Sequence, residues 1–277
     1  MFRARASSSR RLRCGFAPPS TASRAATSSR LDEMTTEVHE VEVDSHPVRY
    51  RATGSGEPLV LVHGLAGSWR WWSPVLGPLA ARRRVYVVNL PRLRQSVRAA
   101  LLSKWLARWL DAAGLDYLEL AGHSLGGLVA AELAATRPEQ TRRLVLVAPA
   151  GIPCGRGLSG RALPLLKTLY DVRRSLPMLT VDAVRTGPID VARGIAFISG
   201  RDLRQELSTV RAPTLLVWGE RDHLVPRRVA DEWRQAMVDV RLEYLPCGHV
   251  PMLEAPAELA ACMLSFLDDE LANESGN

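Results

Sequence analysis

Several features of other protein classes are missing from this chain. It has only four cysteines in 277 residues, Cys14, Cys154, Cys247 and Cys262, and none of them shows paired C-x-x-C spacing. This scarcity argues against a disulfide framework or a cysteine metal site and predicts reduced thiols in a cytoplasmic protein. No hydrophobic run approaches the roughly 18 residues of a membrane-spanning helix, so we expect no membrane span.

Excess basic charge is absent from most of the chain, although the net charge is +7 and the pI about 9.7. Residues 1–31 hold seven arginines and no acid, whereas the remainder has 29 basic and 29 acidic residues. A protein that follows nucleic-acid phosphates needs clustered cations on its folded surface. We therefore expect no nucleic-acid partner.

The basic N-terminal stretch has too few large apolar residues to fold, and residues 1–35 are predicted to be a disordered extension. It lacks the apolar segment of a secretory signal, but its Arg- and Ser-rich, acid-poor composition resembles an organelle transit peptide. Met34 stands where the ordered sequence begins. This position favours a disordered extension, or a start codon assigned too far upstream, over organelle targeting.

What is present is a regular alternation of apolar strand-like runs and helix-like runs. An alternating stretch at 38–57, with a turn at 44–47, predicts an opening hairpin. Six strands alternating with helices predict a mostly parallel eight-stranded α/β sheet with helices on both faces and the hairpin at an antiparallel edge. The predicted later strands are 58–64, 84–90, 116–122, 142–150, 213–219 and 240–246, and the predicted helices include 69–80, 97–114, 226–237 and 255–271.

The interval 151–210 interrupts this alternation. It is helix-prone in pieces separated by Pro and Gly, and it is too long for a simple connection. We interpret it as a small helical cap inserted over the carboxyl edge of the sheet, between core segments 36–150 and 211–277. Residues 150–211 hold ten basic and five acidic residues, which are compatible with anionic substrates or with a solvated helix surface.

The stretch Gly122-His123-Ser124-Leu125-Gly126 matches the G-x-S-x-G motif of a nucleophile elbow, in which a serine occupies a strained turn between strand and helix. The alternative is a loop serine that caps a helix. An apolar strand-like run before the motif and an alanine-rich helix-like run after it supply the context that a nucleophile elbow requires.

A serine nucleophile needs a general base, and the base needs a group that orients it. His249 follows the last predicted strand and is the candidate base. Asp222 follows the preceding strand and is the candidate orienting acid, with Glu220 as a weaker rival. Because loops at the carboxyl ends of parallel strands converge, these groups are expected to meet Ser124 there.

With these residues in place, the sequence resembles the α/β-hydrolase superfamily, of the cap-bearing esterase-like type, over about residues 38–271. The resemblance rests on LVLVHGLAGSWRWW, GHSLGG, LLVWGERDHLVP and CGHVPMLEAP, and on the chain order Ser, Asp, His. It implies that the backbone amides of Leu65 and Leu125 form an oxyanion hole. The family's glycine-rich turn after the fourth strand is replaced by Asn-Leu-Pro-Arg-Leu-Arg-Gln-Ser at 89–96, which puts the pocket in question more than the mechanism.

Other aromatic and imidazole groups are weaker candidates. His63 is interpreted as a structural partner of the oxyanion loop, and His123 as pointing away from the site. The tryptophans near residue 70 are interpreted mainly as packing, with Trp69 as a candidate pocket residue.

The sequence thus predicts a serine hydrolase for a small-molecule ester or related acyl bond, without metal or cofactor. Acyl transfer to peroxide or another alcohol, and carbon-carbon bond hydrolysis, remain alternatives on the same residues. A serine at the elbow argues against relatives that use a carboxylate nucleophile. A ligand-binding protein with an idle site is the alternative from a different class, and neither the substrate nor the oligomeric state follows from the sequence.

Overall fold

The structure of the protein is a computed structural model that describes residues 36–92, 101–155 and 162–269. The predicted N-terminal extension, the second half of the 89–96 loop and the start of the predicted helix 97–114 lie outside the described residues. None of the helices within these ranges combines the length and apolar composition that a bilayer crossing requires.

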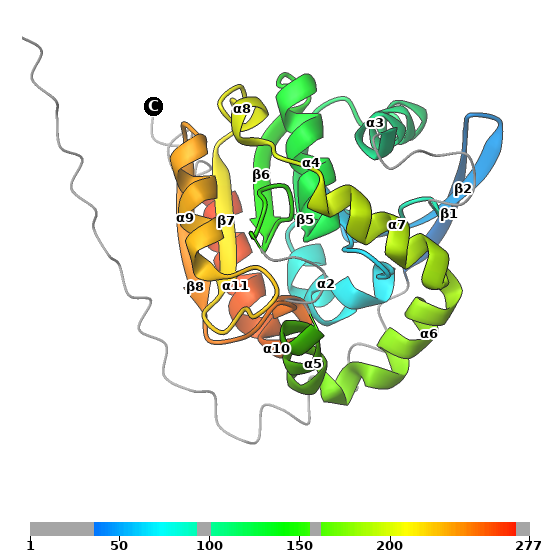
Figure 1. The fold of residues 1–277 in the computed structure, drawn as a ribbon. Coiled ribbons are helices and arrows are strands. Elements are labelled where there is room, and N and C mark those ends of the chain that lie inside the picture. The colour runs from blue at the N-terminus through cyan, green and yellow to red at the C-terminus, as the bar shows by residue number, and fades with distance from the viewer. Residues whose placement is uncertain (1–35, 93–100, 156–161, 270–277) are drawn as a thin grey trace, which may run out of the picture. The chain divides into compact units, whose positions relative to one another are not determined.

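The predicted eight-stranded, mostly parallel sheet is confirmed (Figure 1). Its strand order is β1-β2-β4-β3-β5-β6-β7-β8, in which β1 pairs antiparallel with β2 and β2 with β4, and all later pairs are parallel. The strands are β1 Glu37–Val43, β2 His46–Thr53, β3 Pro58–Val62, β4 Arg84–Val88, β5 Leu118–His123, β6 Thr141–Val147, β7 Thr214–Gly219 and β8 Val240–Leu245.

The opening hairpin is tighter than the sequence suggested. Asp44 and Ser45 alone connect β1 to β2, and both have positive φ, 51° and 60°. Two consecutive residues with positive φ form the type I′ turn, whose twist matches that of the flanking strands. The hairpin therefore extends the sheet at its antiparallel edge.

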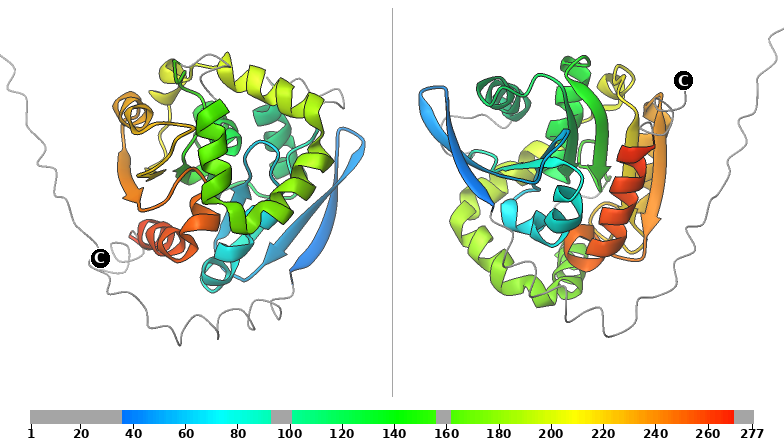
Figure 2. Two further views of the ribbon diagram at one scale, coloured as in Figure 1. Left: turned by 60° about the horizontal axis from the view of Figure 1, so that its bottom comes forward. Right: turned by 180° about the vertical axis from the view of Figure 1, so that it is seen from behind.

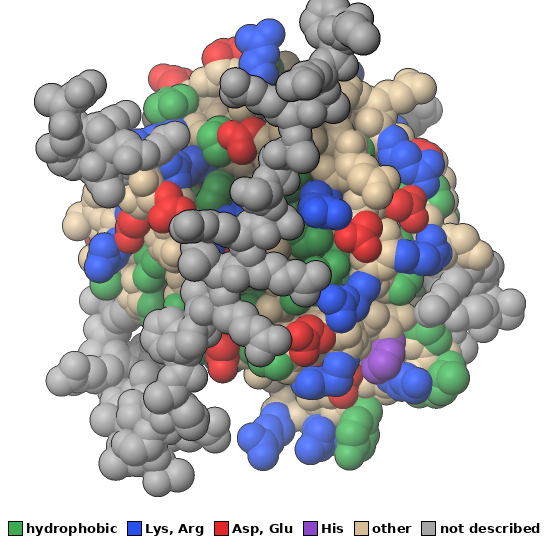
Figure 3. Space-filling view, turned by 90° about the vertical axis from the view of Figure 1, so that its left-hand side faces the viewer, with side chains coloured by type: hydrophobic (Ala, Val, Ile, Leu, Met, Phe, Trp, Pro, Cys, Tyr) green, Lys and Arg blue, Asp and Glu red, His purple; other side chains and the backbone are tan. Residues whose placement is uncertain are grey.

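Helices cover both faces of the sheet. One face carries α3 Leu102–Ala112, α4 Leu125–Thr136 and α9 Arg227–Ala236; the other carries α2 Ser73–Ala80, α10 Pro251–Glu254 and α11 Pro256–Asp268. The rear view in Figure 2 shows α2 and α11 in front of the sheet. On the side that includes α9 and β8, Figure 3 shows acidic and basic side chains interspersed.

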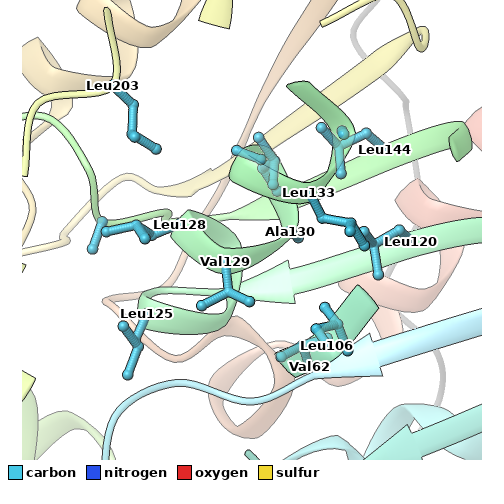
Figure 4. Packing of buried hydrophobic residues seen from close by; sticks show 14 of the residues in the cluster. Val62, Leu106, Leu120, Leu125, Leu128, Val129, Ala130, Leu133, Leu144 and Leu203 are labelled. Carbon is cyan, nitrogen blue, oxygen red and sulfur yellow. The ribbon is translucent and has the colours of Figure 1, made fainter. Parts of the chain in front are cut away.

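Helix α4 lies inside the core and is buried at every residue from Leu125 to Ala134. Figure 4 shows Leu125, Val129 and Leu133 of α4 among side chains of the strands and of α3. A helix that is apolar on nearly every face is typical of a position covered from both sides, and the one charged side chain of α4, Glu132, is paired with Arg201. This burial fixes the N-terminal end of α4, where Ser124 stands.

One of the predicted helices is divided at a proline. The predicted helix 69–80 is a 3-10 turn, η1 Trp69–Trp72, followed by α2. Pro74 has no N–H for an α-helical bond to Arg70, and the Ser73 hydroxyl donates to the Arg70 carbonyl instead, at 2.7 Å. The predicted helix from Ala255 corresponds to α11, and the short helix α10 precedes it.

Between β6 and β7 lies a helical segment, here called the inserted helices. It comprises α5 Ala162–Asp171, η4 Arg173–Ser175, α6 Leu176–Thr186, α7 Pro188–Ser199 and α8 Arg204–Leu207. The views in Figures 1 and 2 place α6 and α7 beside the loop that follows β3. A side-chain contact confirms this position, because the Ser68 hydroxyl donates to Asp182 on α6 at 2.7 Å.

Candidate active site

Ser124 stands at a sharp turn between β5 and α4. Its φ of 51° and ψ of −114° lie outside the regions that a non-glycine residue ordinarily occupies. Glycines allow the close approach of the neighbouring backbone: a Cβ on Gly122 would lie 2.3 Å from the Gly126 carbonyl oxygen, and a Cβ on Gly126 would lie 2.4 Å from that of Val62. The G-x-S-x-G spacing therefore has a steric cause here.

The three groups predicted to act together do meet. Ser124 Oγ lies 3.2 Å from His249 Nε2, and His249 Nδ1 lies 2.8 Å from Asp222 Oδ2. A carboxylate only accepts hydrogen bonds, so Nδ1 carries the proton and Nε2 is left to accept from the serine hydroxyl. This geometry is compatible with the predicted roles of nucleophile, base and orienting acid.

Asp222, and not Glu220, faces the imidazole. Its Oδ1 accepts hydrogen bonds from the amides of Leu224 and Val225, at 2.9 and 2.8 Å, which leaves Oδ2 for His249. The side chain of Asp222 is fully buried, whereas Glu220 is exposed. The loop after β7 thus presents one of its two acids to the base.

Two opposing effects set the pKa of His249. Its burial acts to lower the pKa, but the charge of Asp222, their hydrogen bond and the charge of Glu254 outweigh burial and raise the pKa above its ordinary value. A raised pKa makes the imidazole a stronger base. It also means that acidification protonates this histidine earlier than an ordinary one.

Glu254 holds the loop that carries His249, a contact that sequence reasoning missed. Its carboxylate accepts from the amides on both sides of the histidine, from Gly248 at 2.6 Å and from Val250 at 3.0 Å. Glu254 lies five residues after His249 in the sequence. This spacing predicts a contact with the histidine loop only if the loop is known to fold back on α10.

His123 lies beneath His249 rather than against a substrate. Its Nε2 is 2.9 Å from the carbonyl oxygen of His249 and donates to it, since a carbonyl only accepts. Burial, with the neighbouring charge of His249, lowers the pKa of His123 to about 3, so the ring is neutral near pH 7. His123 therefore supports the backbone of the candidate base.

The loop after β3 forms a tight turn next to Ser124. The Gly67 amide donates to the Gly64 carbonyl at 3.0 Å, and Ala66 has a φ of 57°. A Cβ on Gly64 would lie 3.2 Å from the Cβ of Ser124, so the turn passes directly by the serine. Leu65, the first central residue of this turn, is thereby placed beside Ser124.

His63 and Asn89 hold this turn from outside. His63 Nδ1 donates to the Gly64 carbonyl at 2.8 Å, and its Nε2 accepts from the Leu90 amide at 3.1 Å. Asn89 Oδ1 accepts from the Trp69 amide at 2.9 Å. The described part of the unusual 89–96 loop is thus bonded to the turn that carries Leu65.

A small cavity, partly open to solvent, adjoins the turn. Leu65 and Leu125, the predicted oxyanion residues, both line it, as do Thr186 and Asp190 of the inserted helices. Trp69 is not among its lining residues; the Arg51 guanidinium stacks on the Trp69 ring, 4.1 Å from its centroid. Among the described residues, no cluster of histidine, cysteine and acidic side chains could hold a metal ion.

A mostly parallel sheet with candidate residues after β5, β7 and β8 is typical of a hydrolase fold. Residues 59–262 match the model of the alpha/beta hydrolase family. The chain belongs to this family of enzymes.

Two curated relatives illustrate the range of the family. The chain is 31% identical to a pimeloyl-[acyl-carrier protein] methyl ester esterase of Nitrosomonas europaea, over 78% of this chain and 97% of the relative. It is 30% identical to a dihydrolipoyllysine-residue acetyltransferase component of an acetoin cleaving system of Pseudomonas putida, over 82% of this chain and 68% of the relative.

Among solved structures, a bacterial membrane phospholipase A superposes with a TM-score of 0.73 at 26% identity, covering 90% of each chain. Proteins of this fold therefore act on chemically different molecules. The site of this chain has to supply the argument for its own substrate.

Proposed function

We propose that this protein is a serine esterase that cleaves a small carboxylic ester, or a related acyl compound, through a covalent acyl-enzyme. The observation that carries the proposal is the pair of contacts from Ser124 to His249 and from His249 to Asp222, at 3.2 and 2.8 Å. A pocket that only bound a ligand would have no need of these three groups in this order. Similarity to a methyl ester esterase supports ester chemistry.

In the proposed reaction, Ser124 Oγ attacks the substrate carbonyl carbon while His249 Nε2 takes the hydroxyl proton. The same nitrogen gives that proton to the leaving alcohol as the carbon-oxygen bond breaks. Water then attacks the acyl carbon, His249 takes a proton from the water, and the acid leaves as the proton returns to Ser124. Asp222 stays ionised and stabilises the imidazolium.

The oxyanion formed in both steps is assigned to the amides of Leu65 and Leu125. The N–H of Leu125 is the first of α4, so it has no intrahelical acceptor, and the helix end favours negative charge. Each such donor typically contributes about 3 to 4 kcal/mol to the transition state. We assign the inserted helices, within residues 151–210, the role of a cap that shapes the substrate pocket.

A fluorophosphonate probe tests the proposal directly. We expect the probe to form an adduct on Ser124, and Ser124→Ala to lose the adduct and to hydrolyse short p-nitrophenyl esters at least about 10³-fold more slowly. The control is Ser208→Ala, which removes an exposed hydroxyl bonded to the Gln205 carbonyl and should change neither result. An adduct at another residue, or full activity in Ser124→Ala, contradicts the proposal.

A further inference from the structure

Beside the turn that carries Leu65 lies a buried carboxylate without a hydrogen-bond donor. Asp190, in the first turn of α7, is 2% exposed, and neither of its side-chain oxygens has a hydrogen-bond partner among the described residues. Arg193 Nη1 lies 3.6 Å from Oδ1, beyond hydrogen-bond distance, on a side chain that is 53% exposed. The charge of Asp190 is therefore only partly compensated.

The helix geometry directs Asp190 at the turn that carries Leu65. Gly194 follows one helical turn later and packs on Leu65, because a Cβ on Gly194 would lie 2.3 Å from Leu65 Cδ1. Residues four apart share one face of a helix, so Asp190 also faces the turn at Leu65. It lines the same cavity as Leu65 and Leu125.

The other polar groups of the cavity do not satisfy this carboxylate. His63 already uses both ring nitrogens, one on the Gly64 carbonyl and one on the Leu90 amide. Arg92 lines the cavity on an exposed side chain and makes no ion pair with Asp190. A first-turn aspartate ordinarily gains from the helix dipole at the surface, whereas a buried carboxylate without donors destabilises the fold.

We propose that Asp190 recognises substrate in a subsite beside the oxyanion turn, and that the preferred esters carry a hydrogen-bond donor there, a hydroxyl or an ammonium group. The donor replaces the water lost on burial and completes the shell of the carboxylate. An alkyl ester leaves the carboxylate unsatisfied and is discriminated against for that reason. This inference rests on the proposed esterase function.

Two sets of esters, matched in length, test the inference. In one set the acyl part, and in the other the alcohol part, ends in a methyl, hydroxyl or ammonium group. We expect the wild type to prefer a donor-bearing ester at least about tenfold in kcat/KM in one of the two sets. Asp190→Leu keeps the size of the side chain but removes the acceptor, and should lower this ratio at least about tenfold. Asp190→Asn keeps one acceptor without charge, so a hydroxyl preference persists and an ammonium preference falls. No preference in the wild type, or an undiminished one in Asp190→Leu, overturns the inference.

The matched control is Asp231→Leu. Asp231 also pairs with an arginine three residues on, Arg234, at 3.8 Å, but on the exposed side of α9. This variant should leave the preference unchanged. The Tm of Asp190→Leu should equal or exceed that of the wild type, because an unsatisfied buried charge is removed. A marked fall in Tm would assign Asp190 a structural role instead.

Binding to Ser124→Ala separates this inference from the proposed function. The donor-bearing ester should raise the Tm of that variant more than its methyl counterpart does, and Asp190→Leu in the same background should abolish the difference. Retained hydrolysis by Ser124→Ala would contradict the esterase proposal, while the shifts in Tm would still report on Asp190. If Ser124→Ala is inactive and the two esters raise its Tm equally, the subsite is refuted and the esterase proposal stands.

Discussion

The sheet core and the inserted helices differ in what holds them. Strands β5 and β7 are buried at every residue, and α4 packs against β5 and β6. The inserted helices instead contribute nine of the twelve exposed large hydrophobic side chains among the described residues: Leu163, Leu165, Leu166, Leu169, Tyr170, Leu176, Val181, Val184 and Ile189. Buried apolar side chains hold the sheet core together, whereas many large apolar side chains of the inserted helices are exposed to solvent.

Polar contacts join the inserted helices to the core. Asp182 accepts from Ser68, and Arg201, between α7 and α8, pairs with Glu132 of α4. The groups proposed for bond cleavage come from the core, whereas Asp190 comes from the inserted helices. The proposed reaction thus depends on the buried sheet core, whereas the proposed selectivity depends on the less buried inserted helices.

The largest expected effect is a loss of activity in a variant of the core that keeps its fold. In Asp222→Asn the amide can hold the imidazole with Nε2 protonated, the form that cannot accept the serine proton, so we expect kcat to fall about 10⁴-fold. Steady-state kinetics measure this fall. Glu220→Gln, on the same loop but exposed, should keep normal activity; the reverse result would reassign the acid.

The next effect concerns stability and leaves the candidate site untouched. Glu119 at the start of β5 is 1% exposed and pairs with buried Arg83 at 2.7 Å. Glu119→Gln should lower the free energy of unfolding by about 3 kcal/mol, at the low end for breaking a buried ion pair, because Arg83 keeps the part-buried Asp268 at 3.0 Å as a charged partner. Urea denaturation measures the change. The exposed pair of Arg49 and Glu40 is the control, and Glu40→Gln should cost at most about 1 kcal/mol.

A smaller effect is expected where the two regions meet. Asp182→Ala removes the acceptor of Ser68 and should cost about 1.5 to 3 kcal/mol locally. Amide hydrogen exchange should therefore rise in α6 and stay unchanged in β5 and β6. Asp202→Ala, which breaks an exposed pair with Arg204, should leave exchange in α6 unaltered. Equal acceleration in β5 would mean that the regions unfold as one unit.

The smallest effect is a shift in pH dependence. His249 must be neutral to accept a proton, so activity falls as the pH drops through its pKa, which Asp222 and Glu254 raise despite burial. Glu254→Gln removes one negative charge and should move the acid limb of kcat/KM to lower pH. Glu258→Gln, on α11, is the control and should leave the limb in place. A shift to higher pH would contradict the assigned sign.

Much of the candidate site could be predicted because its signals are local. The glycines at 122 and 126 follow from the close backbone approach at the elbow, and each candidate residue directly follows an apolar strand. Parallel strands bring their carboxyl ends to one edge whatever lies between them in sequence. The proximity of Ser124, Asp222 and His249 could therefore be predicted without knowing the conformation of the loops.

The supporting groups could not be predicted because their partners are distant or lie on folded loops. His123 acts through a carbonyl 126 residues away, and Glu254 acts through amides that face it only when the loop folds back. Asp190 has the sequence signal of an ordinary first-turn aspartate. Its burial depends on how α7 packs on Leu65.

By itself the sequence determined the family, the order of strands and helices, and the residues that could act as nucleophile, base and acid, since strand periodicity and glycine sterics act over a few neighbours. Only the tertiary structure decided which of two acids meets the base, what holds the histidine loop, and which carboxylate enters the cavity. Those outcomes depend on the packing of segments far apart in the chain, where burial and hydrogen-bond geometry, rather than local pattern, select the partner.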